Sequence, residues 1–219
     1  MTTRWFGERV QRNEDPALLT GAATFVDDVE LAGMLHVAFV RSQWGHARIN
    51  GIDTSAAAKR AGVVRIYTAA DLGAYWQPGP LLVSPPPIAN LQFTARTQVP
   101  LARDKVRHVG EPIAVVVAES RYVAEDAAEE VIVDAEPLEA VIDLERALGA
   151  DAPRVHEDLP SNLAAHVVQT KGDYETARAE AAVVVQRRFR YDRGASAAIE
   201  NRGVIASWDA RQRELTVWD

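Results

Sequence analysis

The chain has 219 residues, of which 47% are hydrophobic and 25% are charged, and its formal net charge is −7 at pH 7. These values are typical of a soluble globular protein, and the length favours two small domains over one large one. The negative charge argues against a general affinity for nucleic acid. The absence of cysteine excludes disulfides and thiolate chemistry in this chain.

The N-terminal sequence MTTRWFGERVQRNEDP lacks the apolar core of a signal peptide, and no apolar run is long enough to cross a bilayer. We therefore expect a cytoplasmic protein without a membrane span. The first predicted element is a short helical turn in NEDPALLTG, which Asn13 or Asp15 can cap and Gly21 can end.

Strands and one helix are predicted in the next part of the chain. The apolar run from Met34 to Val40 predicts a strand. An Ala-rich stretch with Asp53 or Thr54 as its N-cap predicts a short helix that ends at Gly62. A further strand is expected from Val63 to Tyr67.

Residues 73–100 contain six of the eleven prolines, which disfavours helix and internal strand and predicts a long ordered loop or edge excursion. After the turn Gly110-Glu111-Pro112, the apolar run Ile113–Ala118 predicts a strand covered on both faces. The stretch after Ser120 has a helical period, and Val131–Ala135 predicts another strand. One face of that helix is expected to carry Tyr122, Ala124, Ala127, Ala128 and Val131, and a solvated face Glu125, Asp126, Glu129 and Glu130.

The composition changes at residues 149–160, where a linker is predicted. Beyond it we expect a short helix from Asp173, a long strand from Val183 to Tyr191, and a hairpin in which DARQRE joins VIASWD to ELTVWD. The last strand stops without a polar tail, which suggests truncation or a missing partner. The arginines of the long strand are interpreted as solvated or subunit-facing: Arg187, Arg188, Arg190 and Arg193.

Candidate catalytic groups are sparse. The five histidines do not share the helical spacing of a metal pair, and His36 is interpreted as a core or interface residue. Ser120 and Ser196 lack a local histidine partner pattern, and no glycine-rich phosphate loop occurs. By residue chemistry alone, the chain reads as scaffold.

The stretch SQWGHAR, residues 42–48, is the most site-like cluster, because Trp, His and Arg on a loop can stack on and hydrogen-bond a ligand. The other interpretation, which we favour, is that Trp44 and His46 pack a strand end while Arg48 pairs with an acid. A weaker alternative is a small-molecule cleft with Trp76 and the Pro-rich loop as one wall.

Three fragments together carry a family resemblance: R.EDPALLTGAATFVDDVELAGMLHVAFVRS..GHARI, VRHVGEPIAVVVAESRYVAEDAAEEVIVDAEPLEAVID, and AIENRGVIASWD. The chain resembles the N-terminal part of the molybdenum-binding large subunit of the xanthine dehydrogenase/aldehyde oxidase/carbon monoxide dehydrogenase family, the molybdenum hydroxylases. The resemblance covers nearly the whole chain, with the motifs in the right order.

This resemblance implies an α+β fold. An α/β-hammerhead domain with an N-terminal extension would occupy residues 1–148, a linker 149–160, and the first, mostly β, part of a molybdopterin-binding domain 161–219. The complete enzyme would be an oxidoreductase with a molybdenum–pterin cofactor. Its expected partners are the remainder of the large subunit or a complementary chain, and FAD-binding and iron–sulfur subunits.

The family's cofactor-contacting and catalytic motifs lie beyond the last residue of this sequence. No catalytic, cofactor-binding or metal-ligating residue can therefore be carried over, and this chain alone is not expected to be active. Glu200, Asn201 and Arg202 are the positions nearest the expected site, and we interpret them as holding a strand turn. The rival hypothesis is a stand-alone, non-catalytic hammerhead module for interaction or assembly.

Overall fold

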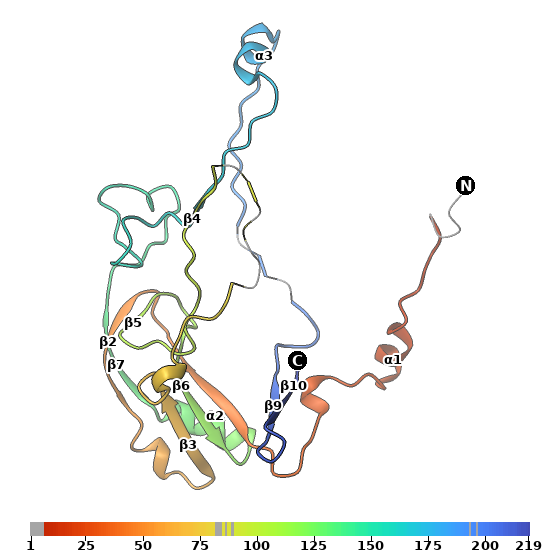
Figure 1. The fold of residues 1–219 in the computed structure, drawn as a ribbon, viewed down its shortest axis with the longest axis vertical. Helices are drawn as coiled ribbons and strands as arrows, with labels where there is room; N and C mark the ends of the chain where they lie inside the picture. The colour runs from red at the N-terminus through yellow and green to blue at the C-terminus, as the bar shows by residue number, and fades with distance from the viewer. Residues whose placement is uncertain (1–6, 82–84, 86, 89, 193, 196) are drawn as a thin grey trace. The chain divides into compact units, whose positions relative to one another are not determined.

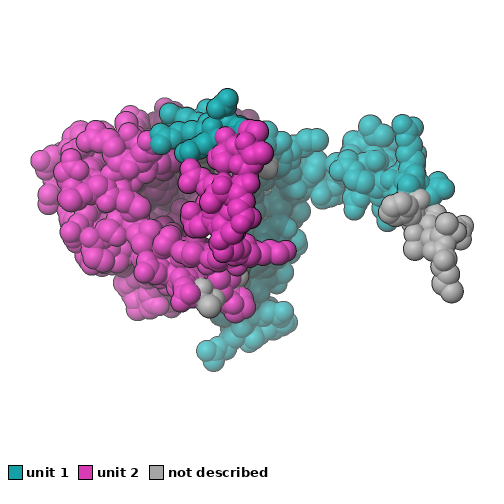
Figure 2. All heavy atoms as spheres, turned by 90° about the horizontal axis from the view of Figure 1, so that it is seen from above, with its two compact units in different colours: residues 1–34, 185–219 teal, residues 35–184 magenta. Residues whose placement is uncertain are grey.

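The computed structural model describes residues 7–81, 85, 87, 88, 90–192, 194, 195 and 197–219. Arg193 and Ser196, which the sequence analysis singled out, lie outside these residues. The chain divides into two compact units, Met1–Met34 with Val185–Asp219 and Leu35–Val184, drawn in teal and magenta in Figure 2. Within the described ranges, no helix combines the length and apolar character that a membrane span requires.

The first unit begins with helix α1, Asp15–Thr20, which ends as predicted at Gly21 in the left-handed conformation (φ 70°). The predicted caps are wrong, because the N-cap is Glu14 and its side chain makes no capping hydrogen bond. The Asp15 carboxylate is instead bound by the Arg12 guanidinium at 2.7 Å. A single 3-10 turn, η1, follows at Val26–Asp28.

The C-terminal hairpin of this unit is confirmed. Strands β9, Ile205–Asp209, and β10, Glu214–Trp218, pair antiparallel (Figure 1). The Asp209 carboxylate stabilises the connecting turn, since it accepts hydrogen bonds from the backbone N–H groups of Arg211 at 2.7 Å and Gln212 at 3.0 Å.

The predicted long strand from Val183 to Tyr191 is wrong, because residues 182–192 carry no regular secondary structure. Its apolar side chains face solvent: Val183 is 78% exposed and Val185 is 74% exposed. No strand in the described part of the chain pairs with this segment. A β-prone sequence without a partner strand cannot satisfy its backbone donors and acceptors as a sheet.

The second unit contains a three-stranded antiparallel sheet in the order β1-β6-β3 (Figure 1). Its central strand β6, Pro112–Ala118, confirms the prediction of a well-covered strand. The edge strands β1, His36–Arg41, and β3, Val63–Thr68, lie close to their predicted positions. His36 is half-buried in β1.

Helix α2, Arg121–Glu129, packs on β1 and β6. Its N-cap is Ser120, whose hydroxyl accepts a hydrogen bond from the Val123 N–H at 3.3 Å. Ala124 and Ala127 are buried as expected, but Tyr122 is 79% exposed and does not belong to the apolar face. The acidic face is exposed as expected at Glu125, Asp126 and Glu129, and Arg60 forms ion pairs with Asp126 and Glu130.

A second sheet has the order β5-β2-β7, with β5 at Lys105–Val106, β2 at Ala47–Asp53 and β7 at Ile132–Pro137. The sequence analysis did not predict β2, because its residues ARINGID include Gly51 and polar side chains and lack an apolar run. Strands β6 and β7, which flank α2 in sequence, therefore belong to different sheets.

The Ala-rich stretch forms only a 3-10 turn, η2 at Ala57–Lys59, and the α-helix predicted there is wrong. Asp53 does not cap a helix, and its carboxylate accepts a hydrogen bond from the Ser55 N–H at 2.8 Å. The remaining elements are η3 at Gly73–Tyr75, β4 at Gln92–Phe93, β8 at Ala165–His166 and α3 at Tyr174–Glu180. Strand β4 pairs with β8, and α3 has the predicted Asp173 as N-cap.

The core of the second unit consists of two clusters of buried side chains. One joins β2, β5 and β6: Ala47, Ala102, Val106 and Ile113. The other lies between β6 and α2: Ala57, Val116, Ala127 and Val131. Strand β6 contributes to both clusters, so its apolar run links the two sheets.

Candidate functional site

Glu200, the first residue predicted to lie near a site, belongs to the first unit. One oxygen of its carboxylate accepts a hydrogen bond from the backbone N–H of Val26 at 2.9 Å. A Cβ atom placed on Gly203 would lie 3.1 Å from a methyl group of Val26, so the two segments approach closely. Asn201 and Arg202 are exposed and lie outside regular secondary structure.

The SQWGHAR stretch has the structural arrangement that we favoured. The Ser42 hydroxyl donates to the carbonyl of Trp44 at 2.8 Å and accepts from its N–H at 3.0 Å. Trp44 packs against the first core cluster. His46 is buried and its Nδ1 donates to the carbonyl of Glu139 at 2.9 Å, while Arg48 lies 3.5 Å from the Glu136 carboxylate.

The turn at residues 110–112 is likewise part of the scaffold. Gly110 has a positive φ of 85°, which a residue with a Cβ adopts only at a cost. Its carbonyl accepts a hydrogen bond from the Arg41 guanidinium at 3.0 Å. Glu111 is buried, and its carboxylate accepts from the N–H of Arg107. These contacts hold the backbone in place at the start of β6. Because these groups already have partners, the turn is interpreted as scaffold and not as a ligand site.

Charged residues tie the predicted linker, residues 149–160, to other parts of the second unit. Lys105 pairs with Glu157, and Arg96 pairs with Asp158. The hydrogen bond from Lys105 lowers the pKa of Glu157, and the hydrogen bond from Arg96 lowers that of Asp158. Burial, followed by the nearby Arg107 guanidinium, lowers the pKa of His156. His156 is therefore neutral at pH 7, and its neighbours Glu157 and Asp158 are paired with Lys105 and Arg96.

Trp76, which the sequence offered as part of a cleft wall, makes two internal contacts. Its indole N–H donates to the carbonyl of Leu101 at 2.8 Å, and the Arg103 guanidinium lies 3.8 Å from the ring centroid. The Arg103 guanidinium thus lies over the indole ring of Trp76, and the indole N–H already has the Leu101 carbonyl as its acceptor.

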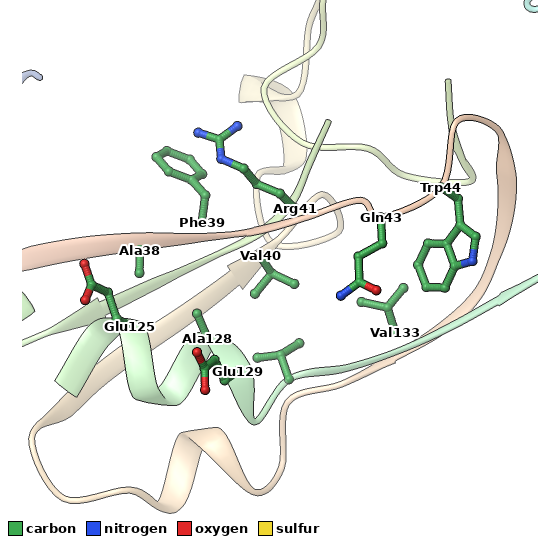
Figure 3. A pocket seen from close by; sticks show the side chains of 11 residues that line it. Ala38, Phe39, Val40, Arg41, Gln43, Trp44, Glu125, Ala128, Glu129 and Val133 are labelled. Carbon is green, nitrogen blue, oxygen red and sulfur yellow. The ribbon is translucent and has the colours of Figure 1, made fainter. Parts of the chain in front are cut away.

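A pocket of about 670 Å³ lies elsewhere in the second unit, lined by residues of β1, α2 and the start of β7 (Figure 3). Ala38 and Val40 project from β1 toward α2, whereas Phe39 and Arg41 project from the opposite side of the strand. This pocket was not predictable from the sequence, because it depends on two sheets that meet only in the tertiary structure.

Among the residues that the structure describes, no three or more His, Asp or Glu side chains come together as metal ligands. The Glu200 carboxylate is already occupied by the Val26 N–H. We therefore assign no catalytic step to a residue of this chain.

Comparison with known proteins gives two family matches along the chain. The profile described as "Aldehyde oxidase and xanthine dehydrogenase, a/b hammerhead domain" matches residues 20–139. The profile described as "Molybdopterin cofactor-binding domain" matches residues 155–219. The two matches follow one another in the order that the resemblance implied, and they confirm the α+β hammerhead fold followed by the start of a cofactor-binding domain.

Individual relatives match almost the whole chain but only part of their own length. The nicotine 6-hydroxylase large subunit of Paenarthrobacter nicotinovorans is 37% identical, over 100% of this chain and 26% of that protein. The carbon monoxide dehydrogenase large chain of Afipia carboxidovorans is 37% identical, over 97% of this chain and 27% of that protein. The crystal structure of quinoline 2-oxidoreductase from Pseudomonas putida 86 matches with a TM-score of 0.84 and 36% identity, over 95% of this chain and 26% of that one.

The hammerhead match alone covers more than half of the chain, and this chain spans about a quarter of the length of these relatives. The sequence motifs, the fold and the matches agree. The chain belongs to the aldehyde oxidase and xanthine dehydrogenase family.

Proposed function

We propose that this chain forms the hammerhead domain and the start of the molybdopterin-binding domain in the large subunit of a molybdenum hydroxylase. Such an enzyme would oxidise an aldehyde, an N-heterocycle or carbon monoxide. The observation that carries the proposal is the pair of consecutive family matches, to residues 20–139 and 155–219. The chain's own part is scaffold and subunit contact.

The internal contacts support a scaffold role. The most site-like residues, Trp44, His46 and Arg48, are used for packing, a backbone hydrogen bond and an ion pair. The polar turn before β6 is held by Arg41 and Arg107. Each of these side chains therefore makes at least one internal contact, while the buried Nε2 of His46 has no hydrogen-bond partner among the described residues.

We expect a molybdenum–pterin cofactor in the complete enzyme, with FAD and iron–sulfur clusters on partner chains or domains that carry electrons away. Glu200, Asn201 and Arg202 are proposed to lie nearest to that cofactor as structural residues. The hydrogen bond from the Val26 N–H to the Glu200 carboxylate supports a structural role for Glu200, because it joins two segments that are far apart in the chain. We also propose a cytoplasmic location, on the basis that the chain has no cysteine.

We propose domain boundaries at residues 1–148 and 161–219, joined by the linker 149–160. The ends of the two family matches, at residues 139 and 155, support this division. The compact unit Leu35–Val184 extends across the linker. The Lys105–Glu157 and Arg96–Asp158 ion pairs account for that, since they fasten the linker itself to residues of the proposed hammerhead domain.

Purification of the protein through an affinity tag from its native host tests the proposal. Intact masses of all co-purifying chains, and their molybdenum, iron and flavin contents, would be measured. We expect molybdenum and pterin together with at least one partner chain or further domain. A polypeptide of only 219 residues without molybdenum or such a partner would instead favour the non-catalytic assembly module.

A further inference from the structure

Two strand edges border the pocket in the second unit. Within the described part of the chain, β1 pairs only with β6 and β7 pairs only with β2. Each strand therefore has one edge without a partner strand. The pocket is lined by Ala38 and Val40 of β1, by Val133 of β7 and by Val131 just before it (Figure 3). The cavity thus lies where one sheet ends and the other begins.

Strand β1 lacks the usual protection of an edge. Natural edge strands are kept from pairing by inward charges, prolines or short length. Strand β1 has six residues, HVAFVR, with its one arginine at the end. Phe39 is 44% exposed and projects to the side of β1 away from α2 (Figure 3). Val37, two residues earlier in the strand, is 54% exposed. An apolar edge of this kind is a template for an added strand.

The polar groups at this pocket favour a cationic occupant. Glu125 and Glu129 of α2 line it and are exposed, and Arg60 pairs with neither of them. Their neighbours Asp126 and Glu130 differ, because both pair with Arg60.

The arginine at the pocket rim, Arg41, offsets only part of the negative charge of Glu125 and Glu129. Arg41 donates to the Gly110 carbonyl and lies 5.1 Å from the centroid of the Phe39 ring. In Figure 3 it points to the side of β1 away from α2. The α2 wall is therefore left with a net negative charge.

We propose that the pocket between β1 and β7 receives an extended segment of a partner subunit, which adds to the β1 edge as a strand. Its side chains alternate, with apolar residues facing Val40 and Val133 and a lysine or arginine facing Glu125 and Glu129. This inference rests on the proposed function, since it names the partner surface of that large subunit. Relatives named as a large subunit and as a subunit of a dehydrogenase complex are consistent with such a partner.

Photo-crosslinking in the purified assembly tests the occupant. The change Gln43→p-benzoylphenylalanine places the probe at the pocket, and Val64→p-benzoylphenylalanine places it on β3, the opposite edge of the same sheet. We expect a crosslink from position 43 to an apolar, lysine- or arginine-containing segment of another subunit, and none to that segment from position 64. A crosslink to a second copy, to another part of the same polypeptide, or to nothing overturns the proposal.

Charge reversal tests the electrostatic part. The E125K/E129K variant should bind the partner subunit about tenfold more weakly at low salt, mainly through slower association. The matched control E175K/E180K on α3 makes the same change in net charge. Hydrogen exchange of β6 first checks that both variants are folded. If the folded variants bind the partner subunit with equal affinity, the electrostatic part of the proposal is wrong.

The two proposals fail in different ways. If the purified assembly contains no molybdenum and no partner subunit, the proposed function is wrong. If it contains both, but position 43 does not crosslink to the partner, the function stands and the docking site is wrong.

Discussion

The carboxylate of Glu200 accepts a hydrogen bond from the backbone N–H of Val26 at 2.9 Å, across 174 positions of the chain. Both residues belong to the same compact unit. The close approach of Gly203 to Val26 reinforces the contact. One carboxylate and one glycine therefore join the start of η1 to the segment that leads into β9.

Removal of this acceptor should loosen the Val26 amide. In Glu200→Ala, we expect that N–H to exchange with solvent about fivefold faster, because one such hydrogen bond contributes about 1 kcal/mol. Glu200→Gln keeps an acceptor oxygen and should show a smaller change. Amide hydrogen exchange of Val26 in the three proteins is the measurement, and equal rates in all of them would contradict the role assigned to Glu200.

Truncation of the central strand should destabilise the second unit strongly. Ile113 of β6 is fully buried, and Ile113→Ala should lower the free energy of unfolding by about 2–4 kcal/mol through lost burial and a cavity. Val37 is half exposed on β1, so Val37→Ala should cost less than about 1 kcal/mol. Urea midpoints compare the two variants, and similar losses would mean that β6 is not the centre of the core.

A methyl group at Gly110 should cost stability through the backbone alone. Its φ is 85°, and a Cβ there would meet no atom within 4 Å. We therefore expect Gly110→Ala to lower the free energy of unfolding by about 1–2 kcal/mol. Gly51 in β2 has equal space but no positive φ, so Gly51→Ala is the matched control and should not destabilise. Thermal unfolding of both variants is the measurement. A lower melting temperature for Gly110→Ala alone would identify backbone strain as the cause, because neither added methyl group meets another atom.

The free energy of unfolding should decrease as the pH is lowered and His156 takes up a proton. Burial and then Arg107 and Arg96 lower its pKa below the usual 6.5, so the unfolded chain binds a proton before the folded protein does. Its contribution is complete above pH 6.5 and is lost as pH falls toward the lowered folded value. Glu157 and Asp158, whose pKa values are also lowered, titrate well below this range.

The variant His156→Gln isolates that contribution. Urea midpoints of wild type and variant would be followed between about pH 7.5 and pH 5.5, where the unperturbed histidine titrates. The decline should be shallower in the variant. An unchanged slope would assign the pH dependence to other groups.

Several elements were predictable because their determinants are local. Gly21 ends α1, the apolar run 113–118 forms β6, Ser120 caps α2, and Asp209 stabilises the hairpin turn. The favoured use of Trp44, His46 and Arg48 was also predictable, since two large rings and a charge next to a strand usually pack and pair.

The errors occurred where pairing partners decide the structure. Val183–Tyr191 has strand-like residues but no partner strand in the described part of the chain, whereas the polar sequence ARINGID becomes β2 because β5 and β7 flank it. Tyr122 fits a helical period but lies on the exposed side of α2.

The sequence by itself determined the family, the order of its two domains, and the elements whose caps, turns and apolar runs are local. Only the tertiary structure decided which strands share a sheet and which acids are paired. It also decided that a pocket lies between β1 and β7. The physical reason is that caps and turns are satisfied within a few residues, whereas strand edges and ion pairs are satisfied by groups far away in the chain.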